Sequence, residues 1–340
     1  MLKSLTGRLS RLAAAARLLR PRTLAELSRS HEDLQRQVKT LEEHVQELRV
    51  RALREQQLQA IARSDDAQVT ALASLDVVLD DSRLSAHVIA AIAASPLELE
   101  PFPHCVVDGL LPEAYYDALI AGLPPVELFA DRPVNKQQLV VPFERAPRYS
   151  ERVWAHMSRH VADQVVGPPI ADKFRGALGR WLHDVLPAGD QDALDRLRMS
   201  CSDGRILLRR RGYRIPPHRD PKWGFITCIL YLARPGDDER WGTQLYAVDR
   251  DTEARDAKPH WIDDTQCRPV RDVTFLRNRA LIFLNSQGAH GAVIPEDAQP
   301  ENLERYAYQF RIGPDRRSMD RLLSGLSPEH RARWTGKMDY

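Results

Sequence analysis

The chain has 340 residues, of which 43% are hydrophobic, so it is long enough for one large domain of about 200 residues and an accessory segment. Its 49 basic and 47 acidic residues leave a formal net charge of +2, which excludes a global basic field that would draw the protein to nucleic acid. The four cysteines, Cys105, Cys201, Cys228 and Cys267, show neither metal-type spacing nor a disulfide framework. This cysteine usage is typical of a reducing compartment and predicts a cytoplasmic protein.

Residues 1–30 form a basic amphipathic segment. Residues 1–22 hold one lysine, five arginines and no acid, with leucines recurring at helical spacing. The pattern is typical of a helix on an anionic membrane surface and also of an organellar transit peptide. We expect peripheral contact with the inner membrane surface, and a helix packed on the protein itself is the alternative. The sequence contains no run of about 18 apolar residues that would span a membrane.

Residues 31–60 are predicted to form a short coiled coil. Apolar residues follow alternating steps of four and three over residues 34–52, namely Leu34, Val38, Leu41, Val45, Leu48 and Ala52. Valine at one seam position and leucine at the other favour two strands. We therefore expect a homodimer through residues 34–52, and a helix folded back against its own chain is the alternative.

Residues 61–99 are rich in Ala, Leu and Asp and are predicted to be a helical linker. Three prolines between residues 96 and 103 break the pattern, so we place the start of the main domain at residue 100. A short strand, a turn and an amphipathic helix follow, the helix beginning near Pro112 and ending at Gly122. Further helix is predicted around residues 150–186.

Beyond Ser200, short runs rich in branched and aromatic residues are separated by Gly, Pro, Asp and Asn clusters. The runs are RILLRRRGY, FITCILYLA, TQLYAV, DVTFL, ALIFLN and RYAYQFRIG. Several short strands at this spacing predict a β-sandwich or barrel packed against the preceding helices, an α+β fold. The main domain would cover residues 100–313, and residues 314–340 would be a helical C-terminal tail.

His218 and Asp220 stand two positions apart in RIPPHRDPKWG. In a strand, residues i and i+2 project from the same face, so both side chains can reach one ion while Arg219 points away. The apolar run LIFLNSQGAHGAV leads into a loop that delivers His290, which a closed sandwich could bring to the same place. Two histidines and one carboxylate on one face of a metal leave the other positions open, as in non-haem Fe(II) oxygenases.

Arg305, in ERYAYQF, shares a strand face with Ala307 and Gln309. A guanidinium that projects into a barrel is costly without an anionic partner, and a ligand carboxylate bound by both arms of the fork would supply one. Tyr231, in ITCILYLA, can offer a phenol hydroxyl to the same carboxylate. Arg311 lies on the same strand face and is the alternative anchor.

Taken in order, the motifs HRD, TCILYL, GTQL, AHGAV and RYAYQF resemble those of the 2-oxoglutarate and Fe(II)-dependent dioxygenases, in the prolyl-hydroxylase-like branch. The opening of residues 100–125 is also similar to the entry of such domains, whereas the first hundred residues lie outside the resemblance. The resemblance implies a double-stranded β-helix, that is, a jelly-roll or cupin-like core, with flanking helices. It also implies Fe(II) ligands His218, Asp220 and His290, 2-oxoglutarate held at its far carboxylate by Arg305 and Tyr231, and ascorbate as a reductant.

The sequence departs from this family in two places. The run Arg209–Arg211 replaces a tyrosine that often precedes the family glycine. We predict this run to be a solvated edge, and a substrate clamp is the alternative. The interval from His290 to Arg305 is longer than usual, so we expect a surface loop there. His260 is the alternative third ligand, and Trp223 would either line the substrate mouth or cover the core.

The activity implied by the resemblance is hydroxylation of an unactivated C–H bond, with succinate and CO2 as co-products. Related halogenases lack the carboxylate ligand, so Asp220 favours hydroxylation. One alternative is an inactive jelly-roll scaffold oligomerised by its coiled coil, and another is a metal-dependent hydrolase or isomerase that needs no Arg305. The substrate stays open among protein side chains, amino acids, lipids and sugar derivatives, with surface-glycan or lipid-linked intermediates suggested by the basic N-terminal segment.

Overall fold

The structure, a computed structural model, describes residues 21–132, 136–185, 194–220, 224–249, 260–285, 287–328 and 331. The chain divides into two units, Met1–Gln59 and Ala60–Tyr340. None of the helices in these ranges is long and apolar enough to cross a membrane. Residues 1–20, which hold most of the predicted membrane-contacting segment, lie outside the described residues.

The described part of the first unit is helical. It belongs to α2, which runs without a break from Pro21 to Leu79, in agreement with the absence of Gly and Pro between residues 23 and 79. Five of the predicted seam residues are between 45% and 63% exposed: Leu34, Val38, Leu41, Val45 and Leu48. The segment is therefore helical as predicted, while its pairing with a second copy stays a prediction.

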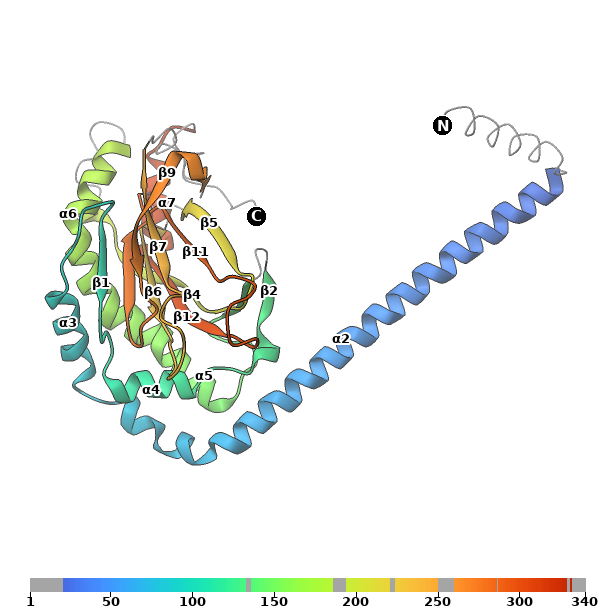
Figure 1. The fold of residues 1–340 in the computed structure, drawn as a ribbon, viewed down its shortest axis with the longest axis horizontal. Helices are drawn as coiled ribbons and strands as arrows, with labels where there is room; N and C mark the ends of the chain where they lie inside the picture. Colours follow the sequence, from blue (N-terminus) through green and yellow to red (C-terminus); the bar gives the residue numbers. More distant parts are fainter. Residues whose placement is uncertain are drawn as a thin grey trace. The chain divides into compact units, whose positions relative to one another are not determined.

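The second unit contains two antiparallel sheets (Figure 1). The major sheet has the order β1 (His104–Val107), β10 (Ala280–Leu284), β6 (Ile226–Tyr231), β12 (Arg305–Pro314), β4 (Met199–Arg209), β3 (Lys136–Val140) and β2 (Ala130–Arg132). The minor sheet has the order β8 (His260–Trp261), β5 (Arg214–Arg219), β11 (His290–Val293), β7 (Thr243–Val248) and β9 (Cys267–Val273). These sheets and their flanking helices confirm the predicted α+β jelly-roll fold.

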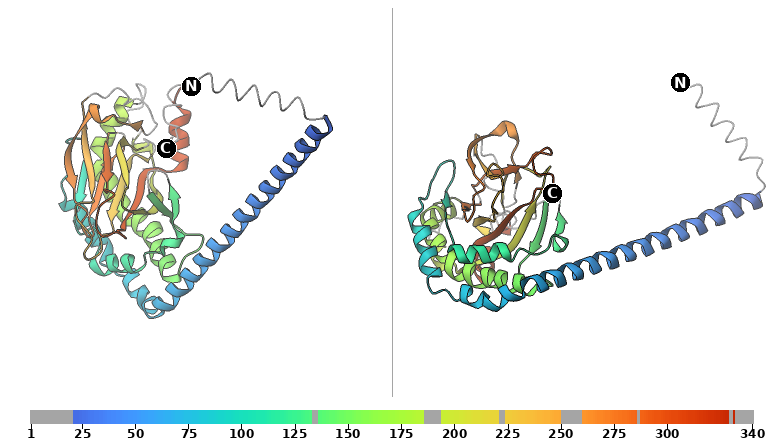
Figure 2. Two further views of the ribbon diagram at one scale, coloured as in Figure 1. Left: turned by 45° about the vertical axis from the view of Figure 1, so that its right-hand side comes forward. Right: turned by 60° about the horizontal axis from the view of Figure 1, so that its bottom comes forward.

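Most helices of this unit gather on one side of the strands, and the C-terminal helix lies apart from them (Figure 2). They are α3 (Leu84–Ala94), α4 (Glu113–Ala121), α5 (Arg148–His156), a π-helical segment (Met157–Val166) and α6 (Gly167–Val185), and α7 (Arg316–Ser324) follows the last strand. As predicted, α4 begins directly after Pro112 and ends at Gly122. The helix expected around residues 150–186 is present as α5, the π-helical segment and α6.

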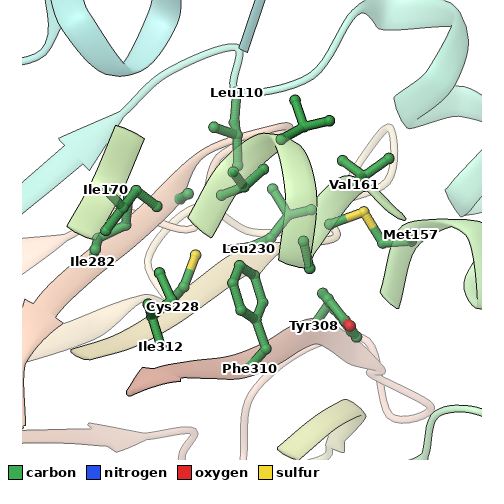
Figure 3. Packing of buried hydrophobic residues seen from close by; sticks show 14 of the residues in the cluster. Leu110, Met157, Val161, Ile170, Cys228, Leu230, Ile282, Tyr308, Phe310 and Ile312 are labelled. Atoms are coloured by element: carbon green, nitrogen blue, oxygen red, sulfur yellow. The ribbon is translucent and has the colours of Figure 1, made fainter. Parts of the chain in front are cut away.

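The central strands of the major sheet are buried on both faces, as the consecutive buried residues of β6 and β10 show. One face packs under the helices: Leu230 of β6 and Phe310 of β12 lie in one cluster with Met157, Val161 and Ile170 (Figure 3). The other face carries Ile229, Tyr231 and Ala307, which cluster with residues of the minor sheet. This inner face is the floor of the site described below.

The segment 61–99, predicted as a helical linker, contributes to this core. Leu75 near the end of α2, and Leu84, Val88 and Ile92 of α3, are buried in the helix-side cluster. The helical character was predicted, but the packing depends on apolar partners supplied by residues more than sixty positions downstream.

Two of the strands differ from what the sequence pattern suggests. Only the first two residues of the run DVTFL are in a strand, because β9 ends at Val273. In contrast, β5 contains Pro216 and Pro217, which cannot donate ladder hydrogen bonds. The register between β5 and β11 shifts at this point, so the prolines occupy an irregularity of the ladder next to His218.

Candidate metal centre

The three residues with the predicted metal-ligand pattern come together between β5 and β11. His218 is directly opposite His290 in the ladder, and Asp220 follows the last residue of β5. One potential ligand atom from each of the three lies within 4.8 Å of the others. All three residues are buried: His218 is 3% exposed, Asp220 is 5% exposed and His290 is 6% exposed. A buried group of this composition needs a partner for its polar atoms, and a metal ion is one that fits.

The backbone around the triad allows this close approach. A Cβ on Gly291 would lie 2.9 Å from the carbonyl oxygen of Ile215, which is closer than real Cβ contacts come. Glycine after His290 therefore lets β11 run against the irregular part of β5.

Both histidines are held in the tautomer that a metal requires. The Nδ1 atom of His218 lies 2.9 Å from the carbonyl oxygen of Pro216, and that of His290 lies 2.9 Å from the carbonyl oxygen of Gly288. Because a carbonyl can only accept, each Nδ1 carries the proton and each Nε2 keeps its lone pair. Burial, followed by the charge of His290, lowers the pKa of His218 to about 3, and burial lowers that of His290. Both imidazoles are thus neutral at pH 7, as metal ligands must be.

Asp220 is held as a carboxylate by two neighbouring strands. Burial is the largest single influence on its pKa and would raise it, but the Arg311 guanidinium, the two histidines and the Thr227 hydroxyl together lower the pKa of Asp220. Arg311 Nη2 lies 3.4 Å from Oδ1 of Asp220, and the Thr227 hydroxyl donates to Oδ2 over 2.9 Å. Arg311 also donates to Asp203 over 2.8 Å. A Cβ on Gly224 would lie 2.3 Å from Cδ of Arg311, so glycine is required there for Arg311 to reach the site.

Arg305 lies on the same inner face of β12, as predicted, with Ala307 and Gln309 beside it in one cavity lining. Its guanidinium carbon is 5.2 Å from the ring centroid of Tyr231 and 4.7 Å from that of Phe275, within cation–π range of both. The side chain is 6% exposed, and among the described residues its Nε and Nη2 atoms have no hydrogen-bond acceptor. Burial lowers the pKa of Arg305. A buried guanidinium with unused donors is an anion-binding group.

The run Arg209–Arg211 is not a uniform solvated edge. Arg209 is buried and lines the same cavity as the triad. Arg210 and Arg211 do lie outside it, where they bond to Glu304 and to the Glu296 carbonyl. The prediction was wrong for Arg209 because it is the last residue of β4, where alternate residues face the cavity.

The cavity residues that escaped the sequence interpretation include Lys136 and Gln138 of β3, and Arg205 of β4. The alternation of KQQLV was the available signal, but β3 was not predicted as a strand.

Two other candidates from the sequence cannot be placed at the site. His260 is in β8 opposite Arg219, but its side chain lies outside the described residues, as does all of Trp223.

Lys136 should make the ligand-free protein less stable at neutral pH. Burial, helped by the charges of Arg209 and Arg205, lowers its pKa from 10.5 to about 7. Between these two pKa values the unfolded chain binds the extra proton, so stability rises with pH across this window. We expect Lys136→Met to raise the free energy of unfolding at pH 7 by about 2–4 kcal/mol, with a gain that shrinks towards about pH 10. Urea unfolding of both proteins across this range measures the effect, and a gain independent of pH would contradict it.

Comparison with known proteins gives the following result. No family model matches the chain, and no curated protein sequence matches it. Among solved structures, HygX from Streptomyces hygroscopicus with nickel, 2-oxoglutarate and hygromycin B bound is 13% identical over 63% of this chain and 83% of that chain, with a TM-score of 0.39. A Pseudomonas putida prolyl-4-hydroxylase is 15% identical over 68% of this chain and 99% of that chain, with a TM-score of 0.35.

A prolyl hydroxylase from Trichoplax adhaerens, in complex with a peptide fragment of the hypoxia inducible factor oxygen degradation domain, is 12% identical. It covers 70% of this chain and 92% of that chain, with a TM-score of 0.36. Two of these three solved structures are thus prolyl hydroxylases, and the third contains nickel and 2-oxoglutarate.

Proposed function

We propose that the chain is an Fe(II)- and 2-oxoglutarate-dependent dioxygenase that hydroxylates a C–H bond. The observation that carries the proposal is the pairing of two features in one cavity. One is a buried group of two neutral imidazoles and a carboxylate, and the other is Arg305, a buried guanidinium with unused donors. A hydrolase or isomerase would need the first feature but not the second.

The donor set fits a ferrous ion. His218 and His290 would each offer Nε2, and Asp220 would offer a carboxylate oxygen, as in the two-histidine, one-carboxylate centres of Fe(II) oxygenases. The carbonyls of Pro216 and Gly288 orient the two rings, and Arg311 and Thr227 orient the carboxylate. When bound, Fe(II) together with 2-oxoglutarate supplies the activation of O2.

Arg305 fits the far carboxylate of 2-oxoglutarate better than Arg311 does. The donors of Arg311 are already directed to Asp220 and Asp203, whereas Arg305 has two nitrogen atoms without an acceptor among the described residues. The rings of Tyr231 and Phe275 fix the plane of the Arg305 fork and exclude water from it. Positioning of this kind is the main contribution of the protein to cofactor chemistry.

The overall reaction balances as follows. Decarboxylation of 2-oxoglutarate to succinate and CO2 provides two electrons, and the C–H bond of the substrate provides two more. One oxygen atom of O2 enters succinate and the other becomes the hydroxyl group of the product. The third protein ligand, Asp220, supports hydroxylation, because the carboxylate takes a coordination position that a halide would need.

Anaerobic addition of Fe(II) and 2-oxoglutarate tests the proposal. We expect a weak visible charge-transfer band with the native protein, and its absence would remove the proposal. Release of succinate on admission of O2, stimulated by ascorbate as the reductant that keeps iron ferrous, would argue against an inactive scaffold.

We also propose that the first unit pairs with a second copy of itself through residues 34–52. Its apolar seam is exposed on a continuous helix, and a heptad seam of valine and leucine favours a two-stranded coiled coil. Light scattering of the full chain should give a dimer mass, and Leu41→Glu with Leu48→Glu should give a monomer. Glu43→Arg, on the helix face opposite the seam, is the control, and a monomeric native chain would contradict the proposal.

A further inference from the structure

A second cavity adjoins Arg305. Its volume is about 350 Å³, which is within the range of sites that bind small molecules. Its walls come from the loop between β6 and β7, from Phe275 after β9, and from the loop between β11 and β12. Among the described residues, Arg305 is the only one that lines both this cavity and the cavity of the metal centre. The two cavities are therefore separate sites that share one guanidinium.

Trp241 and Arg305 are both held close to Phe275. The backbone amide of Phe275 donates to the carbonyl oxygen of Glu239 over 2.7 Å, which fixes the end of the β6–β7 loop, and Trp241 with it, against this residue. The guanidinium carbon of Arg305 is 4.7 Å from the ring centroid of Phe275. Side chains from two distant segments of the chain therefore line the cavity next to the same aromatic residue.

Both side chains have hydrogen-bond donors that the protein does not use. Arg305 is 6% exposed, and its Nε and Nη2 atoms have no acceptor among the described residues. The same holds for the indole Nε1 of Trp241, which is buried although the residue is partly exposed. A buried tryptophan N–H normally has a partner, and an unsatisfied buried donor lowers stability. A ligand that accepts hydrogen bonds from both groups explains why they are there.

The acidic side chains of the cavity already have cationic partners. The ion pairs are Asp237 with Arg234, Asp238 with Arg240, and Glu304 with both Arg210 and Arg234. Arg305, in contrast, forms no ion pair within the described ranges, and its guanidinium contacts the rings of Tyr231 and Phe275. A ligand carboxylate would supply the charge that Arg305 lacks. The cavity is therefore suited to an anion and not to a cation.

The rest of the lining favours a ligand with an apolar body. Besides Trp241, it includes Pro235, Phe275, Pro300 and Leu303. A second anionic group on the ligand would find no lining cation without an acidic partner among the described residues, so a dicarboxylate or a phosphate ester would bury an uncompensated charge. One carboxylate on an apolar group matches both the free donors and the walls.

We propose that this cavity binds a small monocarboxylic acid with an apolar body, whose carboxylate accepts hydrogen bonds from Arg305 and Trp241. Arg305 is also the proposed anchor for the far carboxylate of 2-oxoglutarate, so the acid competes with the co-substrate and inhibits the enzyme. Because binding is reciprocal, 2-oxoglutarate weakens the binding of the acid by the same factor. The binding of the acid stands on the cavity alone, whereas its inhibitory effect rests on the proposed function.

Titration calorimetry of phenylacetate into the full chain tests the inference. We expect saturable binding, and the uncharged analogue phenylacetamide should bind at least about tenfold more weakly, since hydrogen bonds to a charged group are worth that much. Trp241→Phe keeps an aromatic ring and removes a donor that has no acceptor, so the fold should be kept while phenylacetate binding weakens by about tenfold. Absence of binding by the native chain, or equal binding of the acid and the amide, would overturn the inference.

Two substitutions at the rim locate the ligand. Asn302 is exposed and lines the cavity, whereas its neighbour Glu301 is exposed and lies outside the lining. Asn302→Trp should fill the cavity and abolish phenylacetate binding, and Glu301→Trp, the matched control, should leave it unchanged. The affinity for 2-oxoglutarate should be native in both. Phenylacetate binding that persists in Asn302→Trp and is unchanged in Trp241→Phe would place the acid in the cavity of the metal centre and overturn the inference.

The anaerobic Fe(II)–2-oxoglutarate band measures the competition. The apparent dissociation constant of 2-oxoglutarate should rise in proportion to the phenylacetate concentration in the native chain and stay constant in Asn302→Trp. A band that saturating phenylacetate leaves unchanged would overturn the inference. If the native chain gives no band but binds phenylacetate, and Arg305→Met loses that binding, the proposed function alone is contradicted.

Discussion

His290→Ala is expected to abolish the anaerobic Fe(II)–2-oxoglutarate band and to weaken Fe(II) binding by at least about a hundredfold. The substitution removes one of the two neutral imidazoles, and the nearest described side chains, those of His218 and Phe283, are in ring contact with it. Asp220 keeps its partners Arg311 and Thr227, so the change leaves no unpaired charge in the core. The band and the Fe(II) content after gel filtration measure the effect.

His104 provides a matched control. It is also a buried histidine, and its Nδ1 lies 2.8 Å from the carbonyl oxygen of the residue two positions earlier, Phe102. Its Nε2 contacts Arg271 and not the triad. His104→Ala should therefore lower stability, which thermal unfolding will measure, while Fe(II) binding stays intact in the folded fraction. Retention of the band in His290→Ala, or its loss in His104→Ala at a temperature where the protein is folded, would contradict the assignment of His290.

Arg305→Met is expected to abolish detectable 2-oxoglutarate binding while Fe(II) binding is kept. Loss of a buried, doubly bonded charge pair with the ligand costs about 2–5 kcal/mol, which is a weakening of 2-oxoglutarate binding by roughly 30-fold to several thousandfold. In the ligand-free protein the same change removes a buried cation from between two aromatic rings. Its stability should therefore be unchanged or increased. Calorimetric titration with 2-oxoglutarate and urea unfolding give the two readouts.

Arg311→Met is expected to lower the stability of the protein and to disturb the metal centre rather than 2-oxoglutarate binding. It leaves Asp220 buried without its ionic partner, which typically costs about 3–5 kcal/mol of stability, and it disturbs a metal ligand rather than the co-substrate anchor. The pair of variants thus decides between the two arginines on β12. Normal 2-oxoglutarate affinity in Arg305→Met, with its loss in Arg311→Met, would move the anchor to Arg311.

Much of the triad was accessible from the sequence because the signal is local. The i, i+2 relation of His218 and Asp220 implies a shared face. His290 was predicted to lie in a loop after an apolar strand, and the structure places it instead as the first residue of β11. The spacing of Arg305, Ala307 and Gln309 likewise predicted that the three side chains share one face of their strand, and all three line the same cavity. The helical nature of residues 23–79 is consistent with a stretch without Gly or Pro.

What the sequence by itself determined was therefore the type of most elements and the facing of residues within one strand, since both depend on spacings of a few residues. The tertiary structure alone decided which strands are neighbours. Lys136, Arg209 and Arg305 lie opposite one another on three neighbouring strands because β3, β4 and β12 pair in one register. No local sequence pattern specifies that register. The two partners of Arg311, Asp203 and Asp220, are brought to it in the same way. The register of two paired strands depends on which face of each strand is buried, and on irregularities such as the one at the two prolines of β5. Both involve contacts between segments that are far apart in the chain.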